Sequence, residues 1–201
     1  MNHKRTFYSG CILHVMARGV RRTNIFREAM DYRYFLKLLK KFCKQCNIEV
    51  ICWCLMTNHF HLLIKTNDIH VGNMVRSVLS AYAKYFNKKY GFEGHLFDKR
   101  FTSCLVEKTS YFLEVSRYIH LNPVKAGLVK NPIDYKYSSY GLYVNEKHDD
   151  FTVRDRLLGE INDDPDVAAQ IYKIFVEGSG SHKKNEDLIR AEMKEDEQWM
   201  P

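Results

Sequence analysis

Two strands joined by a tight turn lie between two amphipathic helices in this sequence. Residues 48–56, IEVICWCLM, are almost wholly apolar, as in a central strand, and Thr57-Asn58 supplies a turn before a second strand, HFHLLIK, at 59–65. On either side, residues 27–46 and 71–90 repeat apolar residues at helical spacing. We therefore expect a sheet that packs against both helices.

The remaining elements complete one α+β domain. An apolar strand at 9–17 precedes the first helix, and residues 94–107 are predicted as a loop followed by a strand. Residues 109–122 are predicted as a last helix, which Asn122-Pro123 stops. This order predicts an antiparallel sheet with helices packed on one face, so that the other face is left for a ligand.

Charge divides the chain into two parts. Residues 1–148 contain 24 Lys and Arg against 10 Asp and Glu, a net charge of +14, whereas residues 149–201 contain 7 against 14, a net charge of −7. A basic body favours a polyanion partner, most often nucleic acid, although solvated lysine-rich faces are also common. We predict a nucleic-acid-binding domain at 1–148 and an acidic helical extension at 149–201. The extension is expected to begin a helix at a capping box at 152–155, and another at Asp164-Pro165 that runs to about Val176.

The lengths of the apolar segments indicate the cellular compartment of the protein. No stretch is long enough for a signal peptide or a membrane span, so we expect a cytoplasmic protein with no membrane partner. The cysteines lie in apolar segments, which favours reduced, packed thiols over disulfides. They are Cys11, Cys43, Cys46, Cys52, Cys54 and Cys104. The middle four could instead bind zinc, but a helix end and a strand are unusual places for such ligands.

Two histidines and a tyrosine are the candidate catalytic residues. Side chains alternate along a strand, so His59 and His61 are expected to share one face of the sheet. On the helix at 109–122, Tyr118 and Asn122 lie one turn apart beside the apolar face. If this helix lies across the histidine face, the four side chains meet.

Such a grouping suits phosphodiester chemistry. Two neutral imidazoles and an amide oxygen can hold Mg²⁺ or Mn²⁺ with positions open for a phosphate, and the metal withdraws charge from the scissile bond. A tyrosine, with a free pKa of about 10, needs such an electrophile or a nearby base to attack phosphorus. The product would be a phosphotyrosine link to DNA.

Four ordered segments resemble a known family. They are HVMARGVRRTNIF at 14–26, WCLMTNHFHLLI at 53–64, GHLFDKRF at 94–101 and RYIHLNPVKAGLV at 117–129. The chain resembles the HUH single-tyrosine transposases, and especially the REP-associated tyrosine transposases and their transposase-like relatives.

The resemblance implies a ferredoxin-like fold and a metal-dependent endonuclease and strand transferase that acts on single-stranded DNA at hairpin-associated sites. Carried over by position, Tyr118 is the nucleophile that forms a 5′-phosphotyrosine link and frees a 3′-OH. His59 and His61 become the ligands of a divalent metal, Mg²⁺ or Mn²⁺, and Asn122 the third ligand. A homodimer is possible, and the tyrosine could act in its own chain or in a partner chain.

Five basic residues are candidate phosphate contacts. They are Arg18, Arg21, Arg22, Lys99 and Arg100. Two further histidines lie outside this proposed ligand set. His14 is predicted as a core histidine, with contact to the site as the alternative. His120 is predicted as a surface or DNA-contact residue.

Two other functions remain open from the sequence. The first is a domesticated protein that binds DNA or RNA hairpins and has little catalytic turnover. The second is a phosphodiesterase that uses His59 and His61 with water, rather than Tyr118, as the attacking group.

Overall fold

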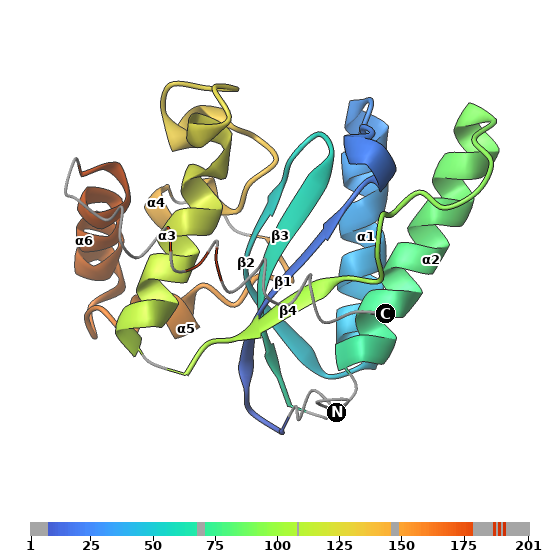
Figure 1. Cartoon of the computed structure of the whole chain (residues 1–201). Coiled ribbons are helices and arrows are strands. Elements are labelled where there is room, and N and C mark those ends of the chain that lie inside the picture. Colours follow the sequence, from blue (N-terminus) through green and yellow to red (C-terminus); the bar gives the residue numbers. More distant parts are fainter. Residues whose placement is uncertain are drawn as a thin grey trace.

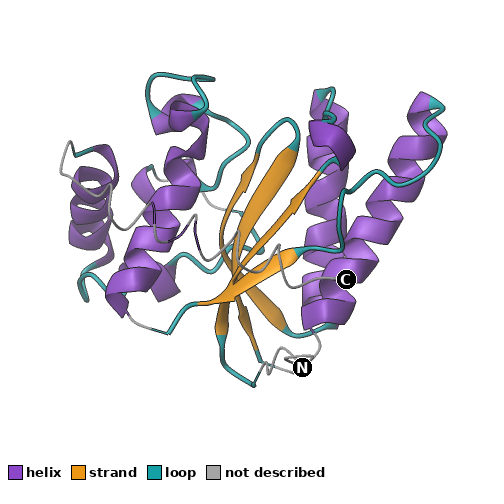
Figure 2. Ribbon diagram, in the orientation of Figure 1, coloured by secondary structure: helices purple, strands orange, loops and turns teal. Residues whose placement is uncertain are grey.

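The computed structural model describes residues 8–67, 71–107, 109–145 and 149–178, together with residues 187, 189 and 191. Figures 1 and 2 show a central sheet between two sets of helices. The strands are β1 (Ile12–Arg18), β2 (Ile48–Leu55), β3 (His59–Thr66) and β4 (Thr102–Leu105). The helices are η1 (Val20–Arg22), α1 (Ala29–Gln45), α2 (Val71–Tyr90), α3 (Thr109–Lys125), η2 (Pro132–Asp134), α4 (Tyr140–Val144), α5 (Asp155–Leu158) and α6 (Pro165–Glu177). Within the described ranges, no helix is long and apolar enough to cross a membrane.

The four strands form one antiparallel sheet in the order β2-β3-β1-β4. The central strand β1 is therefore held by β3 on one side and by β4 on the other. This order arises when two β-α-β units interleave, as in the ferredoxin-like fold. The predicted α+β class is confirmed, and the predicted hairpin and its two flanking helices lie where the apolar pattern placed them.

Helices α1 and α2 cover one face of the sheet (Figure 1). Because strand side chains alternate, Leu13 and Val15 of β1 and Leu62 and Ile64 of β3 all point into this core. Phe35 of α1 is fully buried among them. Burial of an apolar side chain of this size contributes about 1.5–3 kcal/mol. This side of the sheet is thus an apolar core of the usual kind.

Helix α3 and the helices after it cover the opposite face (Figure 2), so the expectation that this face is left for a ligand is wrong. A β-bulge in β2, between Val50 and Cys52, shifts the pairing with β3. As a result, both Ile51 and Cys52 are buried in the second core. Val115 and Ile119, on the predicted apolar face of α3, are buried there too. The sheet face that carries His59 and His61 is therefore the face that α3 covers.

The outer edge of β2 is covered by backbone from the C-terminal part. The Val153 N–H donates to the Val50 carbonyl at 2.8 Å, and Thr152 Oγ1 accepts from the Trp53 indole at 3.1 Å. The predicted helix start at Thr152 is therefore wrong, and α5 begins at Asp155. The covered edge cannot pair with another strand, a contact that exposed edges invite.

The predicted end of α3 at Asn122-Pro123 is also wrong. The helix continues to Lys125, because a proline near the C-terminus of a helix removes only one backbone hydrogen bond. It ends before Gly127, which adopts a left-handed φ of 68°. The N–H of Leu128 then donates to the Pro123 carbonyl at 2.9 Å, closing the last turn. The extra residues bring Lys125 onto the helix that carries Tyr118.

The predicted helix after Asp164 is confirmed. The Asp164 side chain accepts hydrogen bonds from the first N–H groups of α6, and Pro165 occupies the first turn. Tyr172 and Val176 of α6 are buried in the same core as α3. The described part of residues 149–201 thus packs on the rest of the fold, and a domain boundary at residue 148 stays a prediction.

All six cysteines are free thiols. Cys43 is buried on the α1 and α2 side of the sheet, whereas Cys52 and Cys54 are buried on the α3 side. The four cysteines of the alternative zinc motif therefore do not converge. Burial, with a smaller effect of Cys46, raises the pKa of the Cys43 thiol to about 12, so this thiol is inert at neutral pH.

Candidate active site

His59 and His61 lie at the start of β3, on the sheet face toward α3. Their ring centroids are 5.0 Å apart and the rings are nearly perpendicular, at 89°. His61 is buried between Met16 of β1 and Cys54 of β2, its partners in the sheet register. His59 is only partly buried, because it lies at the end of the strand. The two imidazoles thus share a face, as their spacing predicted.

Helix α3 brings Tyr118 to the histidines of its own chain. The Tyr118 ring centroid lies 5.6 Å from that of His61, with an angle of 86° between the rings. Only 8% of Tyr118 is exposed. The expected crossing of this helix over the histidine face therefore occurs, and one chain is enough to bring the three side chains together.

Asn122 and Lys125 follow Tyr118 along α3, one and two turns later. The Asn122 Nδ2 donates to the Tyr118 carbonyl at 2.8 Å, which turns the amide nitrogen toward its own helix. The Lys125 ammonium lies 4.7 Å from the centroid of the Tyr118 ring. A positive charge therefore stands directly beside the candidate nucleophile.

His14 of β1 belongs to this group as well. Its Nε2 lies 3.0 Å from His61 Nδ1, and its ring centroid is 6.0 Å from that of Tyr118. We predicted His14 as a core histidine and gave contact with the site as the alternative; the structure shows it both buried and in contact. The signal was alternation: Leu13 and Val15 face the apolar core, so His14 between them must face α3.

Asn58, at the tip of the hairpin, holds the ring of His59. Its Oδ1 lies 2.7 Å from His59 Nδ1. An amide oxygen can only accept, so Nδ1 of His59 carries the proton and Nε2 keeps its lone pair. The Asn58 Nδ2 in turn donates to the Arg22 carbonyl at 3.4 Å. Sequence reasoning treated Asn58 only as a turn residue and missed this role.

Burial keeps the three imidazoles uncharged. It lowers the pKa of His14 to about 3. Burial, with a smaller effect of the Arg18 charge, lowers the pKa of His59 to about 4. The pKa of His61 is well below its ordinary value because of burial first, and then of His59, His14 and Lys125. At neutral pH these rings are therefore neutral, which is the form that binds metals.

Histidine side chains could supply only two of the ligands that a divalent metal needs at this site. In the described ranges, no three His, Cys, Asp or Glu side chains are arranged to hold a metal. His14 Nε2 is directed at His61 and is not a third ligand. If Nε2 of His61 also keeps its lone pair, the candidate ligand atoms are the Nε2 atoms of His59 and His61 and the Oδ1 of Asn122, with phosphate and water left to fill further positions. Two imidazoles and one oxygen are compatible with Mn²⁺ or Mg²⁺.

A basic turn follows β1 and lies against the histidine hairpin. The Gly19 N–H donates to the Asn58 carbonyl at 2.8 Å. A Cβ on Gly19 would lie 2.2 Å from the Thr23 carbonyl oxygen, so only glycine fits. Arg21 and Arg22 are exposed and adopt left-handed φ values of 51° and 60°, which cost of order 1 kcal/mol each. The turn thus holds two arginines in a strained but defined position beside His59.

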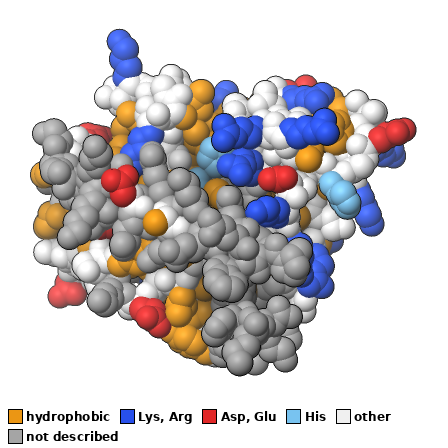
Figure 3. Space-filling model, in the orientation of Figure 1, with side chains coloured by type: hydrophobic (Ala, Val, Ile, Leu, Met, Phe, Trp, Pro, Cys, Tyr) orange, Lys and Arg blue, Asp and Glu red, His pale blue; other side chains and the backbone are white. Residues whose placement is uncertain are grey.

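The second basic segment lies next to this turn. The Asp98 N–H donates to the Arg18 carbonyl at 2.9 Å, so the loop that carries Lys99 and Arg100 is joined to the end of β1. Lys99 and Arg100 are exposed. Figure 3 shows Lys and Arg side chains gathered beside a histidine surface at the upper end of the molecule. The structure therefore brings all five predicted basic residues to the end of the sheet where β3 begins; we call them the basic rim.

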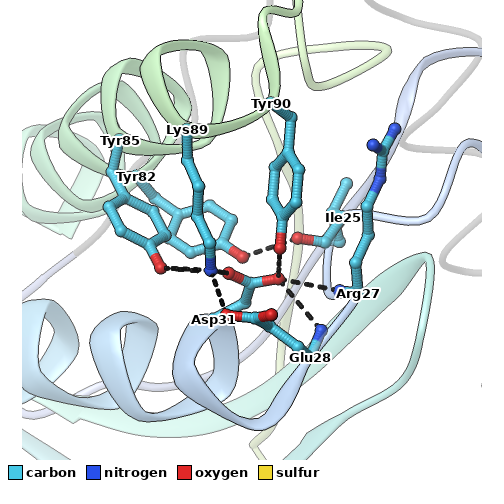
Figure 4. A network of polar contacts seen from close by, with 8 residues as sticks. All are labelled: Ile25, Arg27, Glu28, Asp31, Tyr82, Tyr85, Lys89 and Tyr90. Atoms are coloured by element: carbon cyan, nitrogen blue, oxygen red, sulfur yellow. Dashed lines mark hydrogen bonds and ion pairs between the residues drawn. The ribbon is translucent and has the colours of Figure 1, made fainter.

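The buried carboxylate of Asp31 is the centre of a polar network next to the segment that follows the basic turn (Figure 4). Asp31, near the start of α1, accepts from the backbone N–H of Arg27 at 2.9 Å and from Lys89 Nζ at 2.6 Å. Tyr85 and Tyr90 of α2 donate to it as well. Burial alone would raise the pKa of Asp31, but the hydrogen bonds from Lys89, the backbone and Tyr90 together lower it. The network joins the end of α2 to the segment that leads out of the basic turn.

The prediction that His120 is a surface or DNA-contact residue is wrong. Its side chain is fully buried, with Nδ1 2.8 Å from Tyr172 Oη and Nε2 3.0 Å from Ser139 Oγ. The Tyr172 hydroxyl also donates to Ser116 Oγ at 3.0 Å. Sequence reasoning did not foresee that α6 would cover this side of α3. His120 therefore joins α3 to the C-terminal helices and is not a DNA contact.

Comparison with known proteins adds three findings. A model of the family described as IS200-like transposases matches residues 7–122, which include the histidine pair, the tyrosine and the asparagine. A Haemophilus influenzae protein assigned to the REP-associated tyrosine transposases is 26% identical over 152 residues, 69% of this chain and 85% of the relative. The solved structure of a REP-associated tyrosine transposase bound to a REP hairpin matches with a TM-score of 0.61 and 20% identity, over 72% of this chain and 85% of that one. At 20% identity, this structural likeness shows that the two proteins share a fold and shows nothing more.

Proposed function

This chain belongs to the IS200-like transposases, a family of DNA transposases, and from that premise we propose that it cuts and rejoins single-stranded DNA beside hairpins through Tyr118. The observation that carries the proposal is the packing of Tyr118 against His61, with ring centroids 5.6 Å apart, in one chain. His59 stands beside this pair on the same face of the sheet. A nucleophile and two metal-binding imidazoles are therefore close enough to act on one phosphate.

In the proposed reaction, Tyr118 Oη attacks the scissile phosphorus. The new bond joins the tyrosine oxygen to phosphorus, and the bond to the 3′ oxygen of the preceding nucleotide breaks. The phenol loses its proton to solvent and the departing oxygen takes one up, so a 5′-phosphotyrosine and a free 3′-OH result. Attack by a 3′-OH reverses the step without ATP, because the phosphodiester energy is kept in the tyrosine link.

The protein side chains prepare this step in two ways. His59 and His61 with Asn122 would hold Mg²⁺ or Mn²⁺, which withdraws charge from the phosphate when bound. Lys125, 4.7 Å from the Tyr118 ring, places a positive charge near the phosphate that the tyrosine attacks. Burial of His61 and Tyr118 limits the water that could compete as the attacking group.

The basic rim supplies the proposed DNA contacts. Arg21, Arg22, Lys99 and Arg100 are exposed around the end of the sheet at which His59 lies, where they can bind the backbone on either side of the scissile phosphate. The solved relative is bound to a REP hairpin, which supports a hairpin as the DNA structure that this chain recognises. Backbone contacts position the strand, and the hairpin shape would select the site.

The direct test is formation of a covalent adduct. Protein is incubated with single-stranded hairpin oligonucleotides and Mg²⁺ or Mn²⁺, and a denaturation-resistant protein–DNA product is measured. We expect the adduct with the wild-type protein and none with Tyr118→Phe, because phenylalanine has no oxygen to attack. Tyr111→Phe, a matched change two turns earlier on α3, should retain it.

Two other results would replace the proposal. Binding of many hairpins with no adduct in any metal would favour a hairpin-binding protein with little turnover. Cleavage that survives Tyr118→Phe but is lost in His59→Ala would favour a phosphodiesterase in which water attacks.

A second experiment tests whether Tyr118 acts in its own chain. Because Tyr118 lies against His61 of the same chain, a mixture of Tyr118→Phe and His59→Ala proteins should form no adduct, whether or not the protein is a homodimer. Each variant alone is the control. Substantial adduct from the mixture would mean that a partner chain donates the tyrosine.

A further inference from the structure

The hydrogen bond between His14 and His61 can have either ring as its donor, and the choice decides whether His61 can bind a metal. Their facing atoms, His14 Nε2 and His61 Nδ1, are 3.0 Å apart, which is a hydrogen-bond distance. A hydrogen bond between two ring nitrogens needs one N–H and one lone pair, so one of these nitrogens donates and the other accepts. If His61 donates from Nδ1, its Nε2 keeps a lone pair. If His61 accepts at Nδ1, its Nε2 is protonated and cannot bind a metal.

His59 provides an internal reference for the choice. Its Nδ1 faces Asn58 Oδ1 at 2.7 Å, so its Nε2 lone pair is available. Both histidines can act through Nε2 only if His61 adopts the same proton arrangement. That requires His14 Nε2 to be the acceptor, with its own proton on Nδ1.

We propose that His14 is a positioning residue that accepts the Nδ1–H of His61 and thereby directs the Nε2 of His61 to the metal and the scissile phosphate. This inference rests on the proposed function and adds a residue to it. Histidines that bind metals commonly donate their other ring N–H to a fixed acceptor, which sets the ring orientation. Asn58 fills this role for His59, and His14 fills it for His61.

The fold makes His14 a rigid acceptor. It lies in the central strand, where Leu63 of β3 and Cys104 of β4 are its register partners on either side. Its side chain is 1% exposed, so no water competes for Nε2. The Tyr118 ring packs edge-on against it at 71°, which limits rotation of the imidazole. A ligand oriented by an acceptor in the sheet is held more precisely than one supported by a loop.

The test combines ring spectroscopy with metal affinity. Long-range ¹⁵N–¹H spectra of the metal-free protein report which nitrogen of His61 carries the proton, and calorimetry with Mn²⁺ alone reports affinity. We expect the proton on Nδ1 in the wild-type protein. His14→Phe keeps the volume but has no acceptor, and should lose that preference and weaken Mn²⁺ binding by about 10–100-fold. His14→Gln supplies a carbonyl oxygen and should restore most of both.

Hairpin binding in a chelating buffer and the free energy of unfolding are the controls for folding. The proposal is overturned if wild-type His61 carries its proton on Nε2, or if His14→Phe leaves both the proton position and Mn²⁺ affinity unchanged. If His14→Phe does not fold, the wild-type spectrum and His14→Gln decide. Absence of a DNA adduct despite the expected spectrum and Mn²⁺ binding would contradict the tyrosine chemistry but not the role of His14.

Discussion

The two faces of the sheet use the same strands for different purposes. In β3, Phe60, Leu62 and Ile64 point toward α1 and α2, whereas His59 and His61 point toward α3. The α1 and α2 side is filled by apolar and aromatic side chains. On the α3 side, buried polar groups such as His14, Ser116 and His120 are held by hydrogen bonds to other side chains.

The difference shows how one small sheet can be both stable and reactive. Apolar burial on the first face stabilises the fold and does not depend on hydrogen-bond geometry. On the second face, every buried polar group needs a partner, because an unpaired one costs about 1–3 kcal/mol. The same requirement fixes side-chain orientation, which a catalytic group needs and an apolar core does not.

Asp31 is the main exception to this division, and removing its charge should have the largest effect on stability. Asp31→Asn places an NH₂ group among donors from the backbone, Lys89 and the tyrosines of α2. We expect the free energy of unfolding to fall by about 3 kcal/mol, since one partner of a buried charge pair is lost. Urea unfolding at pH 7 measures it. Asp150→Asn, in the exposed ion pair with Lys40, should cause no measurable change.

The effect of Asp31 also has a predicted pH dependence. Its pKa in the folded protein is below the ordinary value of 3.8, so its ionised form stabilises the fold at higher pH. The difference between wild type and Asp31→Asn should be full above about pH 4 and should shrink as pH falls below 3.8. A difference that stayed constant through this range would mean that packing, and not charge, explains the effect.

A smaller effect is expected on the other face. Tyr172→Phe removes the hydroxyl that links His120 of α3 to α6 and also donates to Ser116. We expect the free energy of unfolding to fall by about 1–2 kcal/mol, because the substitution removes hydrogen bonds between neutral groups and leaves no buried charge unpaired. Thermal or urea unfolding measures it, with Ile174→Ala, at an exposed position of α6, as the control. A loss as large as that of Asp31→Asn would contradict the contrast between the two faces.

Much of the fold followed from local patterns. The apolar hairpin and the two amphipathic helices could be predicted because side-chain periodicity reports secondary structure directly, and the antiparallel sheet was predicted from the order of the elements. The shared face of His59 and His61 followed from strand alternation. The continuation of α3 past Pro123 did not, because the helix ends where Gly127 adopts a left-handed φ and the Leu128 N–H bonds back to the Pro123 carbonyl, and not at the proline itself.

The remaining site residues depended on contacts between distant segments. His14 is 47 positions from His61, and the residues next to either histidine in the sequence do not indicate that β1 and β3 are neighbours in the sheet. His120 was misassigned for the same reason, since its partner Tyr172 lies 52 positions away on α6. The sequence by itself determined the four strands, the three long helices α1, α2 and α3, the histidine face and the candidate tyrosine. Only the tertiary structure decided that Tyr118 meets the histidines of its own chain and which side chains hold each ring, because those facts arise from the order of strands and the crossing of helices.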